Sequence, residues 1–185
     1  MPTPMTHALV GASLSTALPE KLRGLPAAAG CAFLSAAPDL DIVGFVLGVP
    51  YSNAFGHRGI THGLPFAVVA AAGVVLLATV LRELTRARSL RVFLVLVAVI
   101  GSHGILDMAT NGGLGVGLLI PFSPDRFFWP YRPIEVSPIS PSRFLTDGLP
   151  VILTELVWVW LPSLALVIAV GSCTGRRAGF DTERG

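Results

Sequence analysis

The chain contains four histidines, and each lies beside a carboxylate, a turn or the end of an apolar run. Two of them belong to the hexapeptide His57-Arg58-Gly59-Ile60-Thr61-His62, and the others are His7 and His103. Imidazole nitrogens together with carboxylate oxygens suit Zn²⁺ or Mn²⁺. We therefore expect a divalent metal site of one to three ions, with Zn²⁺ as the first candidate and Mn²⁺ as the alternative.

His103 and Asp107 are four residues apart in a segment expected to be helical. At this spacing the two side chains project from one helical face, about 40° apart, and can bind one metal or two neighbouring metals. Ionisable groups within an apolar helix need a partner or water. A lone histidine there is as often a satisfied core residue as a functional one, but the paired carboxylate favours a ligand pair.

Asp39 and Asp41 follow the helix-breaking Pro38, and alternate residues of an extended turn can point the same way. We predict that both are metal ligands and that Asp41 is also a candidate catalytic base. The alternative interpretation is a helix stop with solvated carboxylates.

His57 and His62 are about 140° apart on a helix, so they can only converge through a loop, and Gly59 permits such a turn. Both are predicted metal ligands, as is His7. Arg58 stands beside them as a candidate clamp for an oxyanion or a phosphate. Its alternative role is an interfacial arginine that meets lipid headgroups.

Two further acids lie outside these motifs. Glu135, in an aromatic loop, is a candidate further ligand or general base, and Glu155, early in the last apolar segment, has similar standing. The two cysteines lie in apolar stretches without C-x-x-C spacing, so neither a disulfide framework nor a thiolate zinc site is indicated.

The elements that must position these residues are membrane helices. The 185 residues are 52% hydrophobic and 13% charged, and the mean hydropathy is +0.72. A formal charge of +2 gives no reason to expect a nucleic-acid partner. We predict an all-α, polytopic membrane helical bundle of about five apolar segments with an interfacial loop rich in proline and aromatic residues. One domain spans residues 1–173, and a polar tail, 174–185, is expected to be disordered.

The first hairpin, residues 8–37, is short for a span, so it is expected to be tilted, re-entrant or extended by residues 42–49. Residues 64–81 carry no charge and cover roughly 27 Å as a helix, which makes them the clearest predicted span. A ten-residue arginine-rich connection, 82–91, precedes a span from about residue 92. The interfacial loop is predicted at 121–150 and the last apolar segment at 150–172.

Basic residues cluster at the predicted turns on one side of the bundle. By the positive-inside rule this side is cytoplasmic, together with the C-terminus, and the candidate ligands lie on the extracytoplasmic side. Nine basic residues are then inside and four outside: Lys21, Arg23, Arg82, Arg86, Arg88, Arg91, Arg176, Arg177 and Arg184 against Arg58, Arg126, Arg132 and Arg143. The start of the chain lacks the basic region of a secretory signal, so we expect His7 to be retained.

Several motifs, taken in order, resemble the YdjM-like family of bacterial inner-membrane metal-dependent hydrolases. They are Met5-Thr6-His7, Pro38-Asp39-Leu40-Asp41, the 57–62 hexapeptide, His103-Gly104-Ile105-Leu106-Asp107, Thr110-Asn111-Gly112-Gly113 and Pro121-Phe122. That family is distantly similar to zinc-dependent phospholipase C and P1 nuclease, whose sites use a helical His-x-x-x-Asp pair. These enzymes also use an N-terminal tryptophan amine, whereas the first tryptophan here is Trp129.

The resemblance implies hydrolysis of a phosphoester or other ester, with a membrane lipid or a lipid-linked molecule as substrate and partner. A metal-ion or proton-coupled transporter is the alternative from another class, because intramembrane His and Asp also mark ion pathways. A scaffold protein with a closed structural metal site is a third possibility. Oligomeric state is left open.

Overall fold

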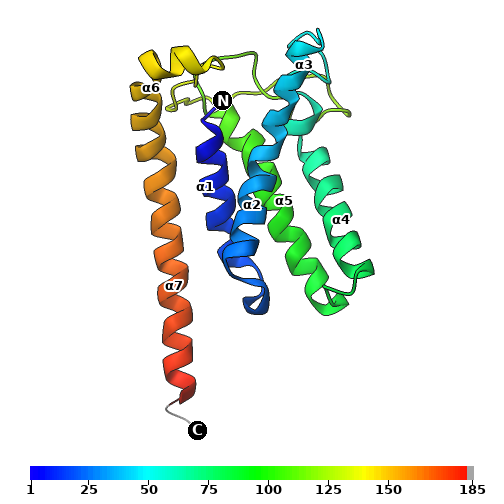
Figure 1. The fold of residues 1–185 in the computed structure, drawn as a ribbon, viewed down its shortest axis with the longest axis vertical. Helices are drawn as coiled ribbons and strands as arrows, with labels where there is room; N and C mark the ends of the chain where they lie inside the picture. The colour runs from blue at the N-terminus through cyan, green and yellow to red at the C-terminus, as the bar shows by residue number, and fades with distance from the viewer. Residues whose placement is uncertain (183–185) are drawn as a thin grey trace.

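The computed structural model describes residues 1–182, and these residues form an all-helical fold, as predicted. They hold no β-strand, only two isolated bridges in the long loop that follows α5. The helices are α1 (Pro4–Leu14), α2 (Leu25–Ala36), α3 (Val43–Val46), α4 (Leu64–Val80), α5 (Arg86–Met108), α6 (Pro141–Glu155) and α7 (Leu161–Thr182). Figure 1 shows α1, α2, α4, α5 and α7 running roughly side by side, with the long loop gathered at one end.

Three helical stretches are long and apolar enough to cross a membrane: Leu25–Val46, Arg86–Met108 and Ser142–Ser172. The first confirms that the early hairpin is extended, because a 3₁₀ turn (Ala37–Ile42) joins α2 to α3. Residues 64–80 form a helix as predicted, but at 17 residues α4 is shorter than the three long stretches. The three stretches agree with a helical membrane bundle.

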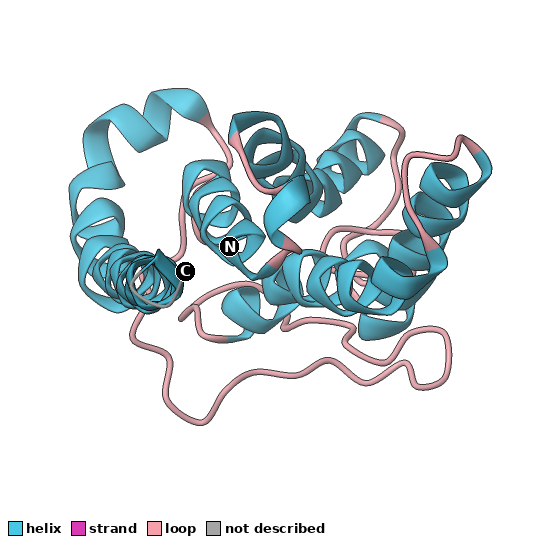
Figure 2. Ribbon diagram, turned by 90° about the horizontal axis from the view of Figure 1, so that it is seen from below, coloured by secondary structure: helices cyan, strands magenta, loops and turns pink. Residues whose placement is uncertain are grey.

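α5 is the central helix of the bundle. It contacts α1, α2 and α4, and 44% of its most apolar window is buried, against 22% and 17% for the other two long stretches. Figure 2 views the bundle from below and shows the helices grouped together, with loop segments along one edge. Its buried positions follow helical periodicity and continue from apolar side chains into the two candidate ligands: Val92, Val95, Leu96, Val99, Ile100, His103 and Asp107.

Two predicted boundaries were wrong. The connection after α4 is short, because α5 begins at Arg86 and takes Arg86, Arg88 and Arg91 into its first turns. Arginine is a good helix former, and Thr85 is a residue type that suits the N-cap position. The interfacial loop ends early as well: α6 begins at Pro141, so residues 141–150 are helical.

The last apolar segment forms a bent helical stretch, in which α6 is followed by the longer α7. In Figure 1 the first turns of α6 cross the end of the bundle before the chain turns down alongside α1. Pro150 lies inside α6, where it removes a backbone donor, and a π-helical turn (Leu156–Trp160) leads into α7. α7 includes residues 174–182 of the expected polar tail, whose residues 183–185 lie outside the described part of the chain.

Glu155 ties the start of α1 to this last helical segment. It is fully buried, and its carboxylate accepts hydrogen bonds from the Thr3 backbone N–H and from the hydroxyl groups of Thr3 and Thr6, the hydroxyls at 2.7 and 2.6 Å. The Trp160 indole N–H donates to the Thr6 hydroxyl oxygen at 2.6 Å. His7 follows Thr6 directly, so this network fixes one candidate ligand against the bundle.

Glu155→Ala is expected to destabilise the protein by about 2–4 kcal/mol, because it leaves several buried donors without an acceptor. Glu155→Gln retains an acceptor oxygen and should lose less. The buried thiol of Cys31, in a Cys173→Ser background, can report unfolding through reaction with a thiol-specific dye on heating. Equal melting temperatures for Glu155→Ala and the parent protein would contradict the anchoring role.

Candidate metal centre

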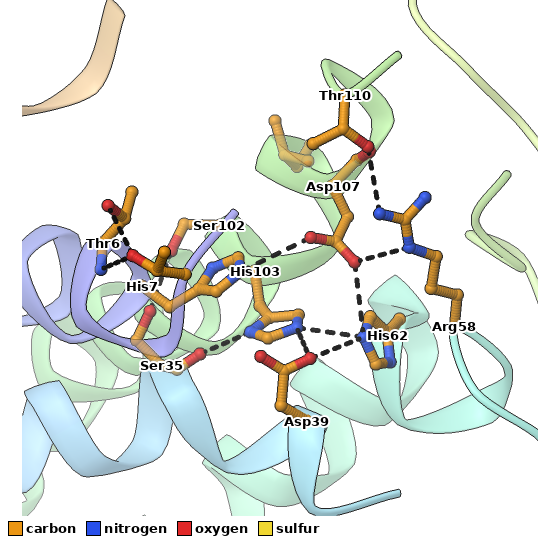
Figure 3. Close-up of polar contacts among 12 residues, drawn as sticks. Thr6, His7, Ser35, Asp39, Arg58, His62, Ser102, His103, Asp107 and Thr110 are labelled. Carbon is orange, nitrogen blue, oxygen red and sulfur yellow. Dashed lines mark hydrogen bonds and ion pairs between the residues drawn. The ribbon is translucent and has the colours of Figure 1, made fainter. Parts of the chain in front are cut away.

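Four side chains from three separate parts of the chain converge at the end of α5. Asp39 comes from the 3₁₀ turn after α2, His62 from the 3₁₀ turn before α4, and His103 and Asp107 from α5. Each offers one ligand atom, and these four atoms all lie within 4.8 Å of one another. All four residues are buried, with Asp39 the most exposed at 9%. Figure 3 shows the four side chains pointing toward one another.

Three distances between the donor atoms fall within the range of a zinc coordination tetrahedron, and a fourth is shorter. The Nε2 atoms of His62 and His103 are 3.0 Å apart, and Asp39 Oδ1 lies 3.6 and 3.3 Å from them. Asp107 Oδ2 lies 3.5 Å from His62 Nε2. Zinc bonds of about 2.0–2.2 Å require ligand atoms roughly 3.3–3.6 Å apart. The residues present therefore fit a zinc-sized divalent ion.

The neighbours of the two imidazoles fix which ring nitrogens face the centre. His103 Nδ1 lies 2.7 Å from the carbonyl oxygen of Ser35, so this nitrogen donates its N–H and Nε2 carries the lone pair. His62 Nδ1 lies 3.1 Å from Asp41 Oδ2 and donates in the same way. Two lone pairs 3.0 Å apart repel each other unless a cation lies between them. Such outer partners are what orient histidine ligands in metal sites.

A proton can occupy this position when no metal is bound. Burial alone would lower the pKa of His62, but the carboxylates of Asp39 and Asp41 outweigh it and raise the pKa of His62 to about 9. At neutral pH His62 is then protonated and donates from Nε2 to His103. A metal ion entering the site must displace this proton.

Asp107 is shared between the cluster and two further side chains. Its Oδ2 lies 3.0 Å from Arg58 Nε, and its Oδ1 lies 3.4 Å from His7 Nε2. The His7 ring also stacks on His103, with centroids 3.7 Å apart. Neither ring nitrogen of His7 makes a hydrogen bond to another described residue. His7 thus lies next to the four-donor group on the side of Asp107 away from His62.

Arg58 is fully buried and fully engaged by the protein. One terminal nitrogen donates to the carbonyl oxygen of Gly112 at 2.8 Å, and the other donates to the Thr110 hydroxyl at 3.0 Å. This arrangement directs the guanidinium at Asp107 and favours a positioning role over the predicted oxyanion clamp. The left-handed conformation in the hexapeptide also falls on Arg58, with φ of 60°, rather than on Gly59.

Gly59 and Gly104 are required for close approach. A Cβ on Gly59 would lie 2.2 Å from the carbonyl oxygen of Ala54, and a Cβ on Gly104 would lie 2.2 Å from that of His62. α5 can therefore approach the His62 backbone closely only because residue 104 has no side chain.

Asp41 and His57 form a second group with His62, in which ligand atoms also lie within 4.8 Å. Asp41 accepts from the Thr61 hydroxyl at 2.9 Å and from the Arg58 backbone N–H, and its Oδ1 lies 2.7 Å from His57 Nδ1. Since His62 faces the first group through Nε2, its Nδ1 is committed to Asp41. The carboxylate of Asp41 therefore serves best to hold the two histidines in place.

Glu135 lies outside both groups. Its side chain accepts a hydrogen bond from Asn111 at 2.7 Å. Sequence reasoning missed the groups that hold the ligands: the Ser35 carbonyl, the Gly112 carbonyl, the Thr61 and Thr110 hydroxyls, and Arg126, which donates to five backbone carbonyls around the hexapeptide loop. Every residue has a backbone carbonyl, so the sequence cannot show which carbonyl will hold a ligand. Thr110 and Gly112, by contrast, belong to the motif Thr110-Asn111-Gly112-Gly113.

Known proteins resemble this chain over most of its length. A family model described as YdjM inner membrane protein matches residues 1–178. The chain belongs to this family. It is 42% identical over 168 residues to the inner membrane protein YbcI of Escherichia coli (strain K12), which covers 90% of this chain and 95% of that protein. No solved structure matches. The family resemblance and the location in an inner membrane are confirmed, while neither name states an activity or a metal.

His103→Ala is expected to abolish tight zinc binding, because it removes one of the four donors at the centre. His57→Ala is the matched control, since it removes a buried histidine of the second group only. Zinc per protein after dialysis against a weak chelator is the measurement. The same zinc content in His103→Ala as in the parent would rule out the four-donor centre.

Zinc affinity is expected to rise about tenfold per pH unit between about pH 6 and pH 8, since one proton leaves His62 on binding. The sign follows from the raised pKa of His62, which keeps the ring protonated across this range. Chelator competition at several pH values measures the slope. A flat profile would show that His62 is already neutral.

Proposed function

We propose that this inner-membrane protein is a metal-dependent hydrolase that acts on a phosphoester or other ester. The observation that carries the proposal is the pair of buried imidazole Nε2 atoms, 3.0 Å apart, that lies beside two buried carboxylates. A divalent cation at this point supplies Lewis-acid activation of water and of an ester oxygen.

Of the four donor residues, three are suited to be permanent metal ligands and one to be a general base. His62, His103 and Asp107 are 0–2% exposed and are each fixed by outer partners, so they suit permanent ligation. Asp39 is the most exposed of the four and pairs with His62 and His103, whereas Asp107 is also held by Arg58. Three protein ligands with one open position are typical of catalytic zinc sites.

In this scheme Asp39 accepts a proton from the attacking water. The water oxygen adds to the carbonyl carbon or the phosphorus, the ester C–O or P–O bond breaks, and the departing oxygen receives the proton. Arg58 keeps Asp107 oriented through the contact at 3.0 Å. Asp41 orients His57 and His62. Glu135 belongs to neither donor group and accepts a hydrogen bond from Asn111, so the scheme gives it no direct part.

Orientation in the membrane is part of the proposal. The turns that carry Lys21, Arg23 and Arg82 lie at the end of the bundle opposite the cluster (Figure 1). Arg91, near the start of α5, donates to the carbonyl oxygen of Ala17 at 3.0 Å, which joins α5 to the turn after α1. By the positive-inside rule this end and the C-terminus face the cytoplasm, and the cluster faces the extracytoplasmic side.

A transporter receives less support from the same contacts. The buried ionisable side chains of the described residues gather at the cluster end, and the remaining buried face of α5 toward the other end is apolar: Val92, Val95, Leu96, Val99 and Ile100. A closed structural metal site would need Asp39 as a permanent fourth ligand. Replacing Asp39 separates this possibility from catalysis.

Asp39→Asn is expected to lower kcat by about 10²–10⁴-fold while the protein keeps its zinc, because the amide cannot accept the proton. The assay is hydrolysis of p-nitrophenyl esters and bis(p-nitrophenyl) phosphate by the zinc-loaded protein in detergent. His103→Ala should lose zinc and activity together. Unchanged turnover in either variant, or no hydrolysis of any substrate by the loaded parent, would overturn the proposal.

A further inference from the structure

A cavity of about 330 Å³ lies directly beside the cluster, in the outer surface of the bundle. Its wall includes Pro4 at the start of α1, Phe33 and Ala36 of α2, and Asp39 and Leu40 of the following 3₁₀ turn. The volume is at the lower end of the range for small-molecule pockets, roughly 300–1,000 Å³. Asp39 is its one ionisable lining side chain.

The position of this cavity determines what can enter it. Its α2 wall belongs to Leu25–Val46, one of the three stretches that can cross the membrane. Phe33 and Leu40 are 65% and 63% exposed there, as expected for side chains that face lipid hydrocarbon. A cavity with apolar walls that opens between such residues is continuous with the hydrocarbon region of the bilayer.

Asp39 connects this cavity to the chemistry. It lines the apolar wall, and its Oδ1 also lies 3.3 Å from His103 Nε2. An extended apolar chain that fills the cavity therefore ends, on its polar side, beside Asp39, the one member of the cluster that lines this wall. The other side chains that line the cavity are apolar.

We infer that this cavity binds an acyl chain of a membrane lipid and presents the adjoining ester or phosphoester to Asp39 and the cluster. The substrate class is thus an acyl lipid that enters sideways from the bilayer, and not a water-soluble ester. The inference rests on the proposed function for its catalytic part, while binding of the chain can be measured without turnover.

A second apolar cavity provides an internal control. It has a similar volume, about 340 Å³, and is lined by Leu14, Ala17, Leu94 and Ala98 with Arg91. None of its lining residues belongs to the cluster. An alanine lines each cavity, so Ala36→Phe and Ala98→Phe insert the same ring into matched places.

The experiment uses the full-length protein in nanodiscs that contain a phospholipid with a diazirine near the end of one acyl chain. After irradiation, mass spectrometry measures labelling of the 33–40 segment. Ala36→Phe should lower it roughly tenfold, because the ring excludes about two methylenes of the chain. Ala98→Phe should leave it unchanged. Phe33→Ser, a change at an exposed position, should lower the same labelling if Ala36→Phe does not fold.

Hydrolysis gives the second arm. With p-nitrophenyl esters of increasing chain length, the parent should show kcat/KM rising with length, and Ala36→Phe should remove this rise but spare the acetyl ester. Labelling of the 33–40 segment that is equal in all variants overturns the acyl-chain site even if short esters are hydrolysed. Labelling lost in Ala36→Phe, with no hydrolysis of any ester by the parent, supports the lipid site and rejects the proposed function.

Discussion

Two carboxylates, Asp39 and Asp107, are buried beside two imidazoles whose Nε2 atoms lie 3.0 Å apart, and this concentration of ligand atoms needs a cation. Removing a charged carboxylate from water is costly unless it is paired or bound to a metal. His62 can meet part of this need by taking a proton, and Arg58 meets part of it at Asp107. The surrounding helices then have to hold four donors from three chain segments in one small volume.

Backbone carbonyl groups hold several side chains of the site in position. A helical carbonyl from α2 orients His103, and two groups of the loop after α5 fix Arg58. Arg126, from the same loop, donates to two carbonyl oxygens of the hexapeptide, those of His57 and Arg58, and to three others, those of Tyr51, Asn53 and Gly115. The long loop at this end is therefore a rigid support for the site, which explains why an otherwise simple helical bundle carries so much irregular chain at one end (Figure 1).

Composition and spacing predicted the helical class and the ligand pair on α5, because an apolar helix with His and Asp at i and i+4 admits few other arrangements. They also placed Asp39 and His62 among the ligands, and the structure brings both to this pair. Sequence could not show that Arg58 turns inward to Asp107, since an arginine beside an apolar span is equally suited to headgroups. Nor could it separate Asp39 from Asp41: the two residues lie in one turn and contact opposite nitrogens of the same His62 ring, which only the structure reveals.

The left-handed backbone conformation of Arg58 allows this one residue to contact both Asp107 and Asp41. A non-glycine residue in this region costs of order 1–3 kcal/mol, which persists only where surrounding contacts demand it. Here the strained residue sends its guanidinium inward to Asp107, while its backbone N–H donates to Asp41 and its carbonyl accepts from Arg126. One residue thus connects the carboxylate of the cluster with the carboxylate that orients His57 and His62. Arg82, in the turn before α5, has a similar φ of 62°, so it is the contacts of Arg58 with both carboxylates, and not its φ alone, that tie this residue to the site.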